Sequence, residues 1–451
     1  MQQHRVQIGI QNNGHTTAPV HLSVSDRRAH LHIVGKTGTG KSTLLRNLLL
    51  QDIEAGRGLA LIDPHGDLAL SLLDAIPKNR VRDVVYLDAG DTAFPVAWNL
   101  LKSDGDNALI ASGIVSAFKA IWRDSWGPRL EYILYAAVAT LLECENTSLL
   151  GVSRILSDRA YRAWAVKQLR DPGLKLFWQN EFERFDERQR AEIVSPVQNK
   201  VGQLLLAPHV RNIFGQVKSR VSAKFVMEND RVLIVNLAKG HIGEDKANLL
   251  GALIVAQFEQ AALARAKLSE ETRRDFALYV DEFQNFSTDR FASILSEARK
   301  YRLSLTVAHQ YLDQLSEPLQ AAVFGNVGSL IAFRCGERDA RVLSTELGST
   351  YRADALTSLP NYEAIAQLLE QGEQLQALRV RTLPSVPTRR KQARSIIRNS
   401  RARFGVPKPV VEAKLARWLQ RSIPLPPNRR SQYISDRLPS IRDRLSSTGE
   451  K

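Results

Sequence analysis

Seven short apolar runs along the chain have the length of buried β-strands, and they alternate with stretches of helical periodicity. Most of the runs end in a glycine or a polar residue. This alternation is typical of a mostly parallel sheet with helices on both faces. Such sheets bind ligands at the carboxyl ends of their strands, where Gly35, Asp63, Asp281 and Gln310 should lie. The predicted strands are Leu31–Val34, Gly58–Ile62, Asp83–Leu87, Val232–Val235, Phe276–Val280, Leu303–Ala308 and Ser329–Phe333.

The middle of the chain breaks this alternation. From Asp104 to Val221 no strand pattern occurs, and apolar residues recur at helical spacing near 106–122, 129–143, 158–170 and 186–206. The pattern predicts an all-helical domain, residues 104–221, inserted into an α/β core of residues 1–103 and 222–384. Prolines and a basic run mark a third part, residues 385–451. Within it, residues 411–420 suit a short amphipathic helix, and the rest is expected to be largely flexible.

Charge separates the third part from the rest of the chain. Residues 385–451 hold 17 Lys and Arg against 4 Asp and Glu, a net charge of +13, whereas the first 384 residues hold 45 against 43. A basic tail suits contact with a polyanion such as nucleic acid, although a solvated tail that only maintains solubility has the same composition.

Cysteine content and hydropathy indicate a cytoplasmic protein without a membrane span. The two cysteines, Cys144 and Cys335, have neither metal-ligand spacing nor a disulfide pattern, which fits a reducing compartment. The polar N-terminus has no signal-peptide pattern. The longest apolar stretches, such as Ile133–Leu142 and Leu249–Phe258, are shorter than a membrane span.

A phosphate-binding loop follows the first predicted strand. Gly35, Gly40, Lys41 and Ser42 fill the pattern G-x-x-x-x-G-K-[ST], and a Leu-rich helix, Thr43–Glu54, leads out of it. Such a loop wraps backbone N–H groups around the β-phosphate, and its lysine reaches the β- and γ-oxygens. The serine hydroxyl binds Mg²⁺, so ATP and Mg²⁺ are the expected cofactors. The predicted nucleotide-binding residues are Gly35, Lys36, Thr37, Gly38, Thr39, Gly40, Lys41, Ser42 and Thr43.

Two acids follow the apolar run Phe276–Val280. Asp281 is placed to bind Mg²⁺ through water, and Glu282 to act as general base toward the attacking water. Acids end many strands, and the phosphate loop in the same chain makes this pair significant.

Several segments together resemble the HerA/FtsK superfamily of DNA-pumping ATPases, and most closely its conjugative coupling-protein (TraG/TraD-like) branch. The resemblance covers roughly residues 25–350, and the helical insert, the DEFQNF strand end and the ARKYRLSLTVAHQ segment are its specific parts. It implies a RecA-like P-loop NTPase core, and it departs from the family in lacking transmembrane helices before the ATPase. The segments are His32–Leu44, Leu61–Leu68, Gly127–Leu142, Leu278–Phe286, Leu295–Leu315 and Gly325–Ala340.

Gln310 and Arg299 are two further candidate residues for ATP hydrolysis. Gln310, at the end of a predicted strand, can hydrogen-bond both the water and the γ-phosphate, or it can simply cap the strand. Arg299 lies eleven residues before Gln310. In the coupling proteins an arginine at that spacing is supplied to the neighbouring subunit's nucleotide, so the resemblance implies this role for Arg299. A solvated helix charge is the alternative, and the adjacent Lys300 and Arg302 blur the assignment.

Other positions leave alternatives open. Arg334 either faces a nucleotide or pairs with a nearby acid such as Glu337 or Asp339. Asp63 either supports the metal site or forms a tight turn. Arg129 matches the family pattern, and no chemistry is assigned to it. His209, His241 and His309 have no metal-ligand neighbours in the sequence and are expected to be structural or surface residues.

The leading hypothesis is an ATP-hydrolysing ring motor, a homohexamer, that translocates or pumps DNA in conjugative or mobile-element transfer. A relaxosome or secretion-type protein is a further expected partner. The competing hypothesis is an ATP-switched assembly or recruitment factor that acts on protein partners and does not move DNA.

Overall fold

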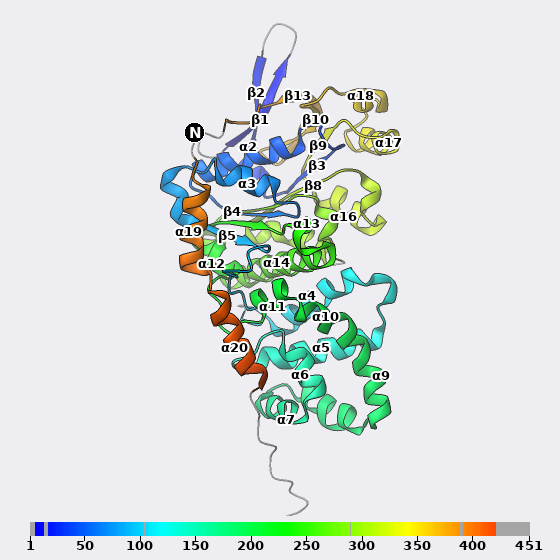
Figure 1. Ribbon diagram of the computed structural model, residues 1–451. Coiled ribbons are helices and arrows are strands. Elements are labelled where there is room, and N and C mark those ends of the chain that lie inside the picture. The colour runs from blue at the N-terminus through cyan, green and yellow to red at the C-terminus, as the bar shows by residue number, and fades with distance from the viewer. Residues whose placement is uncertain (1–4, 13–16, 103–104, 289, 388–390, 421–451) are drawn as a thin grey trace, which may run out of the picture.

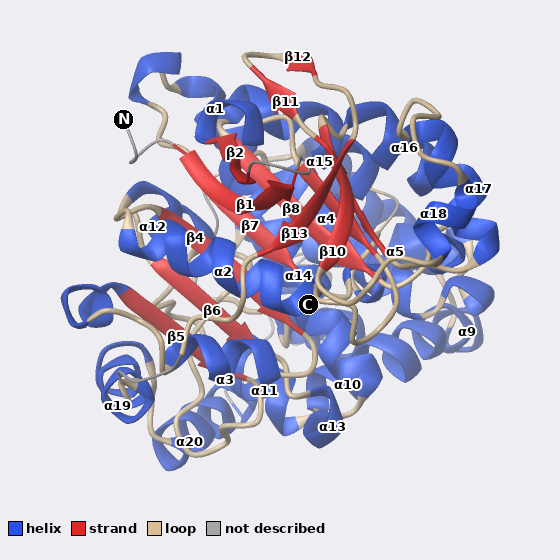
Figure 2. Cartoon of the chain, turned by 90° about the horizontal axis from the view of Figure 1, so that it is seen from above, coloured by secondary structure: helices blue, strands red, loops and turns tan. Residues whose placement is uncertain are grey.

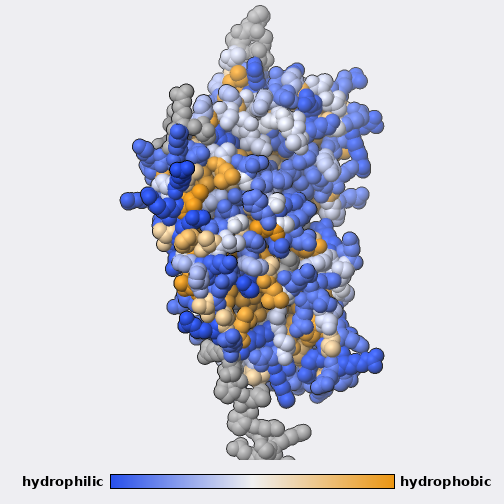
Figure 3. Space-filling view, viewed as in Figure 1, coloured by the Kyte–Doolittle hydropathy of each residue, from blue (hydrophilic) through white to orange (hydrophobic). Residues whose placement is uncertain are grey.

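The structure is a computed structural model that describes residues 5–12, 17–102, 105–288, 290–387 and 391–420. The molecule is elongated (Figure 1), with a β-hairpin at one end, a large sheet in the middle and a group of helices at the other end. Figure 3 shows the surface of the molecule from the same side as Figure 1. This surface is mostly hydrophilic, with apolar side chains gathered in its middle and lower parts.

The sheet has the order β2-β1-β13-β10-β9-β3-β8-β7-β4-β6-β5. Its seven strands from β9 to β5 are parallel, and they are the seven strands that the sequence predicts. Nearly all of their residues are buried, because helices cover both faces. The predicted α/β core with a mostly parallel sheet is therefore confirmed. The parallel strands are β3 (Leu31–Val34), β4 (Gly58–Asp63), β5 (Val84–Asp88), β6 (Val232–Asn236), β7 (Phe276–Val280), β8 (Leu303–His309) and β9 (Ser329–Phe333).

Four antiparallel strands that the sequence analysis missed extend the sheet beyond β9. Three of them place buried residues at alternate positions, as with Val6 and Ile8 in the first, so they do not form continuous apolar runs. The fourth, Glu363–Gln367, is buried over four residues, but only three of its five residues are apolar. These strands are β1 (Arg5–Asn12), β2 (Thr17–Ser23), β10 (Glu363–Gln367) and β13 (Leu378–Thr382), and a separate two-stranded ribbon contains β11 (Leu369–Glu370) and β12 (Glu373–Gln374).

Helices cover both faces of the sheet (Figure 2). The helices α2 (Lys41–Glu54) and α3 (Asp67–Leu73) share one hydrophobic cluster with the sheet. The helix α14 (Glu244–Ala264) shares a second hydrophobic cluster with the sheet. By length and composition, residues Glu244–Lys267 are the one candidate membrane span in the described part of the chain. However, 83% of the most apolar 18-residue stretch of this segment is buried inside the protein. The remaining helices of the core are α1 (Val24–Arg27), α13 (Lys239–Ile242), α15 (Phe291–Glu297), α16 (Glu317–Asn326), α17 (Glu337–Glu346) and α18 (Ala353–Thr357).

Between β5 and β6 the described residues form helices and no strand. The domain boundaries stay a prediction, because one hydrophobic cluster runs from the sheet into these helices and joins Ile114 to Phe258. The helices are α4 (Asn107–Ile121), α5 (Pro128–Glu143), α6 (Gly151–Ser157), α7 (Arg159–Gln168), α8 (Pro172–Leu176), α9 (Glu187–Val197), α10 (Gln203–Leu206), α11 (Pro208–Phe214) and α12 (Ala223–Glu228).

Two helices of the basic region pack along the side of the molecule (Figure 1). The helix α19 (Ala393–Phe404) was not predicted, and α20 (Lys408–Gln420) contains the predicted segment 411–420. The hydroxyl of Ser400 accepts a hydrogen bond from the Tyr86 N–H at 2.9 Å and donates one to the Tyr86 carbonyl at 3.1 Å, so it satisfies the free edge of β5. The rest of the predicted flexible tail, residues 421–451, lies outside the described residues.

Candidate nucleotide site

The predicted phosphate loop connects β3 to α2 at the carboxyl edge of the sheet. Gly38 and Gly40 have φ values of +78° and +122°, a region that glycine enters without steric cost. Gly35 through Gly40 form the loop, and Lys41, Ser42 and Thr43 form the first turn of α2. All nine predicted nucleotide-binding residues therefore lie at the positive N-terminal end of one helix, which suits a phosphate chain.

The Lys41 ammonium is buried inside this loop. Its Nζ donates hydrogen bonds to the carbonyl oxygens of Gly35 at 2.5 Å and Lys36 at 3.1 Å. Burial lowers the pKa of Lys41, while Glu282 and Asp281 act in the opposite direction. A buried cation beside a loop of backbone N–H groups fits a polyphosphate.

Asp281 and Glu282 lie directly after β7, as predicted. Burial, followed by the charges of Asp63 and Glu282, raises the pKa of Asp281 to about 7. Crowded buried acids of this kind suit a divalent cation. The described residues contain no group of three or more His, Cys, Asp or Glu that could hold a metal alone. Mg²⁺ usually binds through one or two protein ligands together with substrate phosphates, so Ser42 and Asp281 fit it in the presence of a nucleotide.

Glu282 is held by two amides. Gln310 Nε2 donates a hydrogen bond to Glu282 Oε1 at 2.9 Å, and Gln284 Nε2 donates one to Oε2 at 2.6 Å. Glu282 itself has a φ of +47°, a backbone conformation that is uncommon for residues other than glycine. The structure thus brings Gln310 and Glu282 into contact. Sequence reasoning missed Gln284, whose only signal was its position two residues after Glu282.

Asp63 forms a tight turn, which was one of its two alternatives. Its carboxylate accepts hydrogen bonds from the N–H groups of His65 at 2.9 Å and Ala69 at 2.8 Å. The same carboxylate is close enough to Asp281 to raise the pKa of that group. The turn therefore also places a second negative charge beside the candidate metal position.

Two histidines form a buried pair behind the loop, which the sequence did not indicate. His32 on β3 and His309 on β8 have parallel rings, and their Nε2 atoms lie 2.6 Å apart. The Tyr311 carbonyl can only accept, so His309 Nδ1, 3.0 Å away, carries its proton, and Nε2 accepts from His32. Burial lowers the pKa of His309 to about 4. The neutral pair therefore links the phosphate-loop strand to the residue before Gln310.

Arg299 lies far from the phosphate loop of its own chain. It is exposed on the turn Ala298–Tyr301, which leads into the amino end of β8, whereas Gln310 follows the carboxyl end. A strand rises about 3.3 Å per residue, so β8 separates the two by roughly 20 Å. If Arg299 serves a nucleotide, it must serve one held by another subunit.

Arg334 pairs with neither of the acids considered from the sequence. Its guanidinium donates to the Leu359 carbonyl at 3.2 Å and to Asn361 Oδ1 at 2.8 Å. It therefore fixes the turn before β10. Arg129 is exposed in the first turn of α5.

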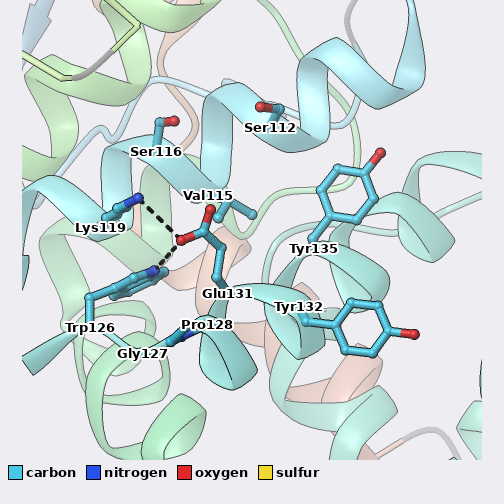
Figure 4. A pocket seen from close by; sticks show the side chains of 10 residues that line it. All are labelled: Ser112, Val115, Ser116, Lys119, Trp126, Gly127, Pro128, Glu131, Tyr132 and Tyr135. Carbon is cyan, nitrogen blue, oxygen red and sulfur yellow. Dashed lines mark hydrogen bonds and ion pairs between the residues drawn. The ribbon is translucent and has the colours of Figure 1, made fainter. Parts of the chain in front are cut away.

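A separate hollow of about 470 Å³ lies between α4 and α5 (Figure 4). At one end, Glu131 Oε2 accepts a hydrogen bond from Trp126 Nε1 at 2.9 Å and lies 3.3 Å from Lys119 Nζ. The hollow lies within the helical segment that carries part of the family resemblance, and far along the chain from the phosphate loop. Its lining consists of Ser112, Val115, Ser116, Lys119, Trp126, Gly127, Pro128, Glu131, Tyr132 and Tyr135.

The site combines a phosphate loop, two acids that follow a nearby parallel strand and a glutamine that follows the strand between them. This combination defines a P-loop nucleoside triphosphatase. Comparison with protein families agrees. Residues 6–88 match the family described as "Helicase HerA, central domain", and residues 275–366 match "TraM recognition site of TraD and TraG". In these two segments the chain is therefore similar to the HerA family and to the TraD and TraG family.

Solved structures of this group share the fold. The bacterial conjugative coupling protein TrwBdeltaN70 is 14% identical, with a TM-score of 0.57 over 84% of this chain and 91% of that one. TrwB in complex with ADP and Mg²⁺ is 15% identical, with a TM-score of 0.57 over 82% and 88%. VirB4 of Thermoanaerobacter pseudethanolicus is 15% identical, with a TM-score of 0.56 over 84% and 96%. No curated protein matches the chain by sequence.

Proposed function

We propose that this protein is an ATP-hydrolysing ring motor of the coupling-protein type that moves DNA. The observation that carries the proposal is the contact between Gln310 and Glu282 beside the buried Lys41, because it unites the residues that hydrolysis needs. TrwB, which shares the fold, is a conjugative coupling protein and binds ADP with Mg²⁺. These likenesses support a conjugative-transfer NTPase.

Each residue of the site has a definite task in this proposal. Lys41 and the loop N–H groups bind the β- and γ-phosphates, while Ser42 and Asp281 hold Mg²⁺, which neutralises charge on the phosphate oxygens. Glu282 takes a proton from the attacking water. Gln310 contacts Glu282 from β8, so a change at the γ-phosphate reaches both residues together.

The position of Arg299 supports a ring. An exposed arginine roughly 20 Å from its own loop can complete only a neighbour's site, which closes a head-to-tail assembly. We propose a homohexamer, with DNA in contact with basic surfaces and with a relaxosome or secretion-type protein as a further partner on the cytoplasmic side. The match of residues 275–366 to a family named for TraM recognition supports the protein partner.

The test is the rate of ATP hydrolysis with and without single-stranded and double-stranded DNA. Stimulation by DNA supports the motor. Hydrolysis that DNA leaves unchanged, together with ATP-dependent binding of a protein partner, would instead identify a switched assembly factor. Lys41→Ala should abolish ATP binding, whereas Glu282→Gln should bind ATP and fail to turn over, because an amide cannot accept the proton.

A further inference from the structure

The order of the strands indicates on which side of the phosphate loop the nucleoside of a bound nucleotide would lie. The strand β3, which leads into the phosphate loop, lies between β8 and β9. Gln310 and the two acids follow β8 and β7 on one flank, and they mark the γ-phosphate end. Arg334 follows β9 on the other flank, and Tyr362 lies directly before the antiparallel strand β10 at the same edge. A nucleotide whose γ-phosphate faces Glu282 therefore extends its nucleoside toward the β9–β10 flank.

Tyr362 stands at this flank in a conformation that large residues rarely adopt. Its φ is +67°, and 48% of the residue is exposed. Its ring touches the phosphate loop: a methyl group placed on Gly40 would lie 3.0 Å from Tyr362 Cδ1. Residues held in sparsely populated backbone conformations are concentrated at active sites and ligand-binding sites.

Several hydrogen bonds hold this conformation. The Tyr362 N–H donates to the Thr39 carbonyl at 2.7 Å, and the Tyr362 carbonyl accepts from Thr382 N at 2.8 Å and Oγ1 at 3.0 Å. Arg334 holds the preceding turn through Leu359 and Asn361. The backbone of Tyr362 is thus attached to the phosphate loop itself, and these hydrogen bonds hold the residue beside the loop without a ligand.

We infer that Tyr362 is the platform on which the base of the bound nucleotide stacks. The inference rests on the proposed ATPase function and extends it to the nucleoside half of the substrate. Every nucleobase has a π-face, so stacking on Tyr362 binds ATP and GTP with a similar gain. The ring contributes to affinity and leaves the hydrolytic residues on the other flank unchanged.

The test compares binding of ATP, GTP and inorganic tripolyphosphate to the full chain and its variants. Tyr362→Leu keeps an apolar side chain over Gly40 but has no aromatic face, and Tyr362→Phe keeps the face. Loss of one base–aromatic stack weakens binding by about 5- to 150-fold, so Tyr362→Leu should weaken ATP and GTP within that range. Its tripolyphosphate affinity should be unchanged, and Tyr362→Phe should bind all three ligands as the wild type does.

Two results would overturn the inference. Wild-type ATP affinity in Tyr362→Leu would show that the base does not lie on this ring. An equal loss of ATP and tripolyphosphate would show that Tyr362 only supports the loop. Lys41→Ala keeps the two hypotheses separate: if it leaves ATP binding intact, the proposed site itself is wrong, whatever Tyr362 does.

Discussion

Removal of residues 385–451 should unfold the ATPase core, whereas removal of residues 421–451 alone should leave it folded. The difference lies in α19 and α20. They bury the apolar side chains of Ile396, Phe404, Val411 and Leu415, and Ser400 satisfies both backbone groups of Tyr86 at the edge of β5. A chain that ends at residue 384 loses all of these contacts.

The structure gives the size of the effect. Burial of one large apolar side chain stabilises a protein by about 1.5–3 kcal/mol, so four of them contribute roughly 6–12 kcal/mol. A whole domain is stable by only about 5–15 kcal/mol. Loss of the two helices therefore removes a large part of the stability of the core. It also exposes the edge of β5, which favours aggregation.

Urea unfolding and size-exclusion chromatography of chains that end at 384 and at 420 would measure this. The chain that ends at 420 should unfold with the full-length midpoint and keep its basal ATPase rate. An unchanged midpoint for the chain that ends at 384 would refute the packing of α19 and α20. The same two proteins separate folding from DNA contact. Residues 421–451 hold 7 Lys and Arg against 3 Asp and Glu, and each lost phosphate contact should lower the log–log salt slope of DNA binding by about 0.7–0.9.

Three further predictions concern the core and the subunit interface. Asp52→Asn should lower the free energy of unfolding by about 3–5 kcal/mol, because it leaves the buried Arg27 without its charge partner. Asp275→Asn removes a half-exposed pair with Arg28 and should lower it by less than about 1 kcal/mol. Urea titrations of the two variants would measure the difference. Arg299→Ala should bind ATP and lose about 10³–10⁵ in rate, and mixing it with Glu282→Gln should restore some activity; no recovery in mixed rings would refute a shared site. Burial lowers the pKa of His30 to about 4, so the folded state binds fewer protons than the unfolded state between pH 4 and 6.5. The contribution of this imidazole to the free energy of unfolding should therefore fall by up to about 3 kcal/mol as pH falls through that range, and His309 should contribute a similar fall. A flat profile in urea titrations would contradict the two neutral imidazoles.

The parallel strands were predictable because of their burial. Strands covered on both faces form continuous apolar runs, as Leu59 to Ile62 and Leu278 to Val280 do. The antiparallel strands β2 and β13 face solvent on one side, and β13, with the sequence Leu-Arg-Val-Arg-Thr, resembles a polar segment. The helix α19 escaped prediction for a related reason. Its buried positions Ile396, Ser400 and Phe404 recur every four residues, but the four arginines of the helix dominate its composition.

Some parts of the candidate site were predictable from local sequence, and others were not. The phosphate loop and the acids of β7 are local patterns, and a single segment of sequence predicts each of them. The contact of Gln310 with Glu282 and the pairing of His32 with His309 arise only when strands up to 277 residues apart lie side by side. Tyr362 reaches the loop through the turn before an antiparallel strand that the sequence pattern did not predict. No local pattern encodes such contacts, because the register of the sheet creates them.

The strand β8 connects two candidate site residues, Gln310 after its carboxyl end and Arg299 before its amino end. At the carboxyl end, Gln310 donates to Glu282, and the His309 carbonyl accepts a hydrogen bond from the Gly35 N–H at 3.3 Å, so the strand contacts the loop directly. At the amino end, the turn that bears Arg299 joins the strand without an intervening loop. A strand hydrogen-bonded on both sides, here to β7 and β3, moves as a rigid unit. In the proposed ring, β8 would therefore hold Gln310 beside one nucleotide at a fixed separation from the arginine offered to the next subunit.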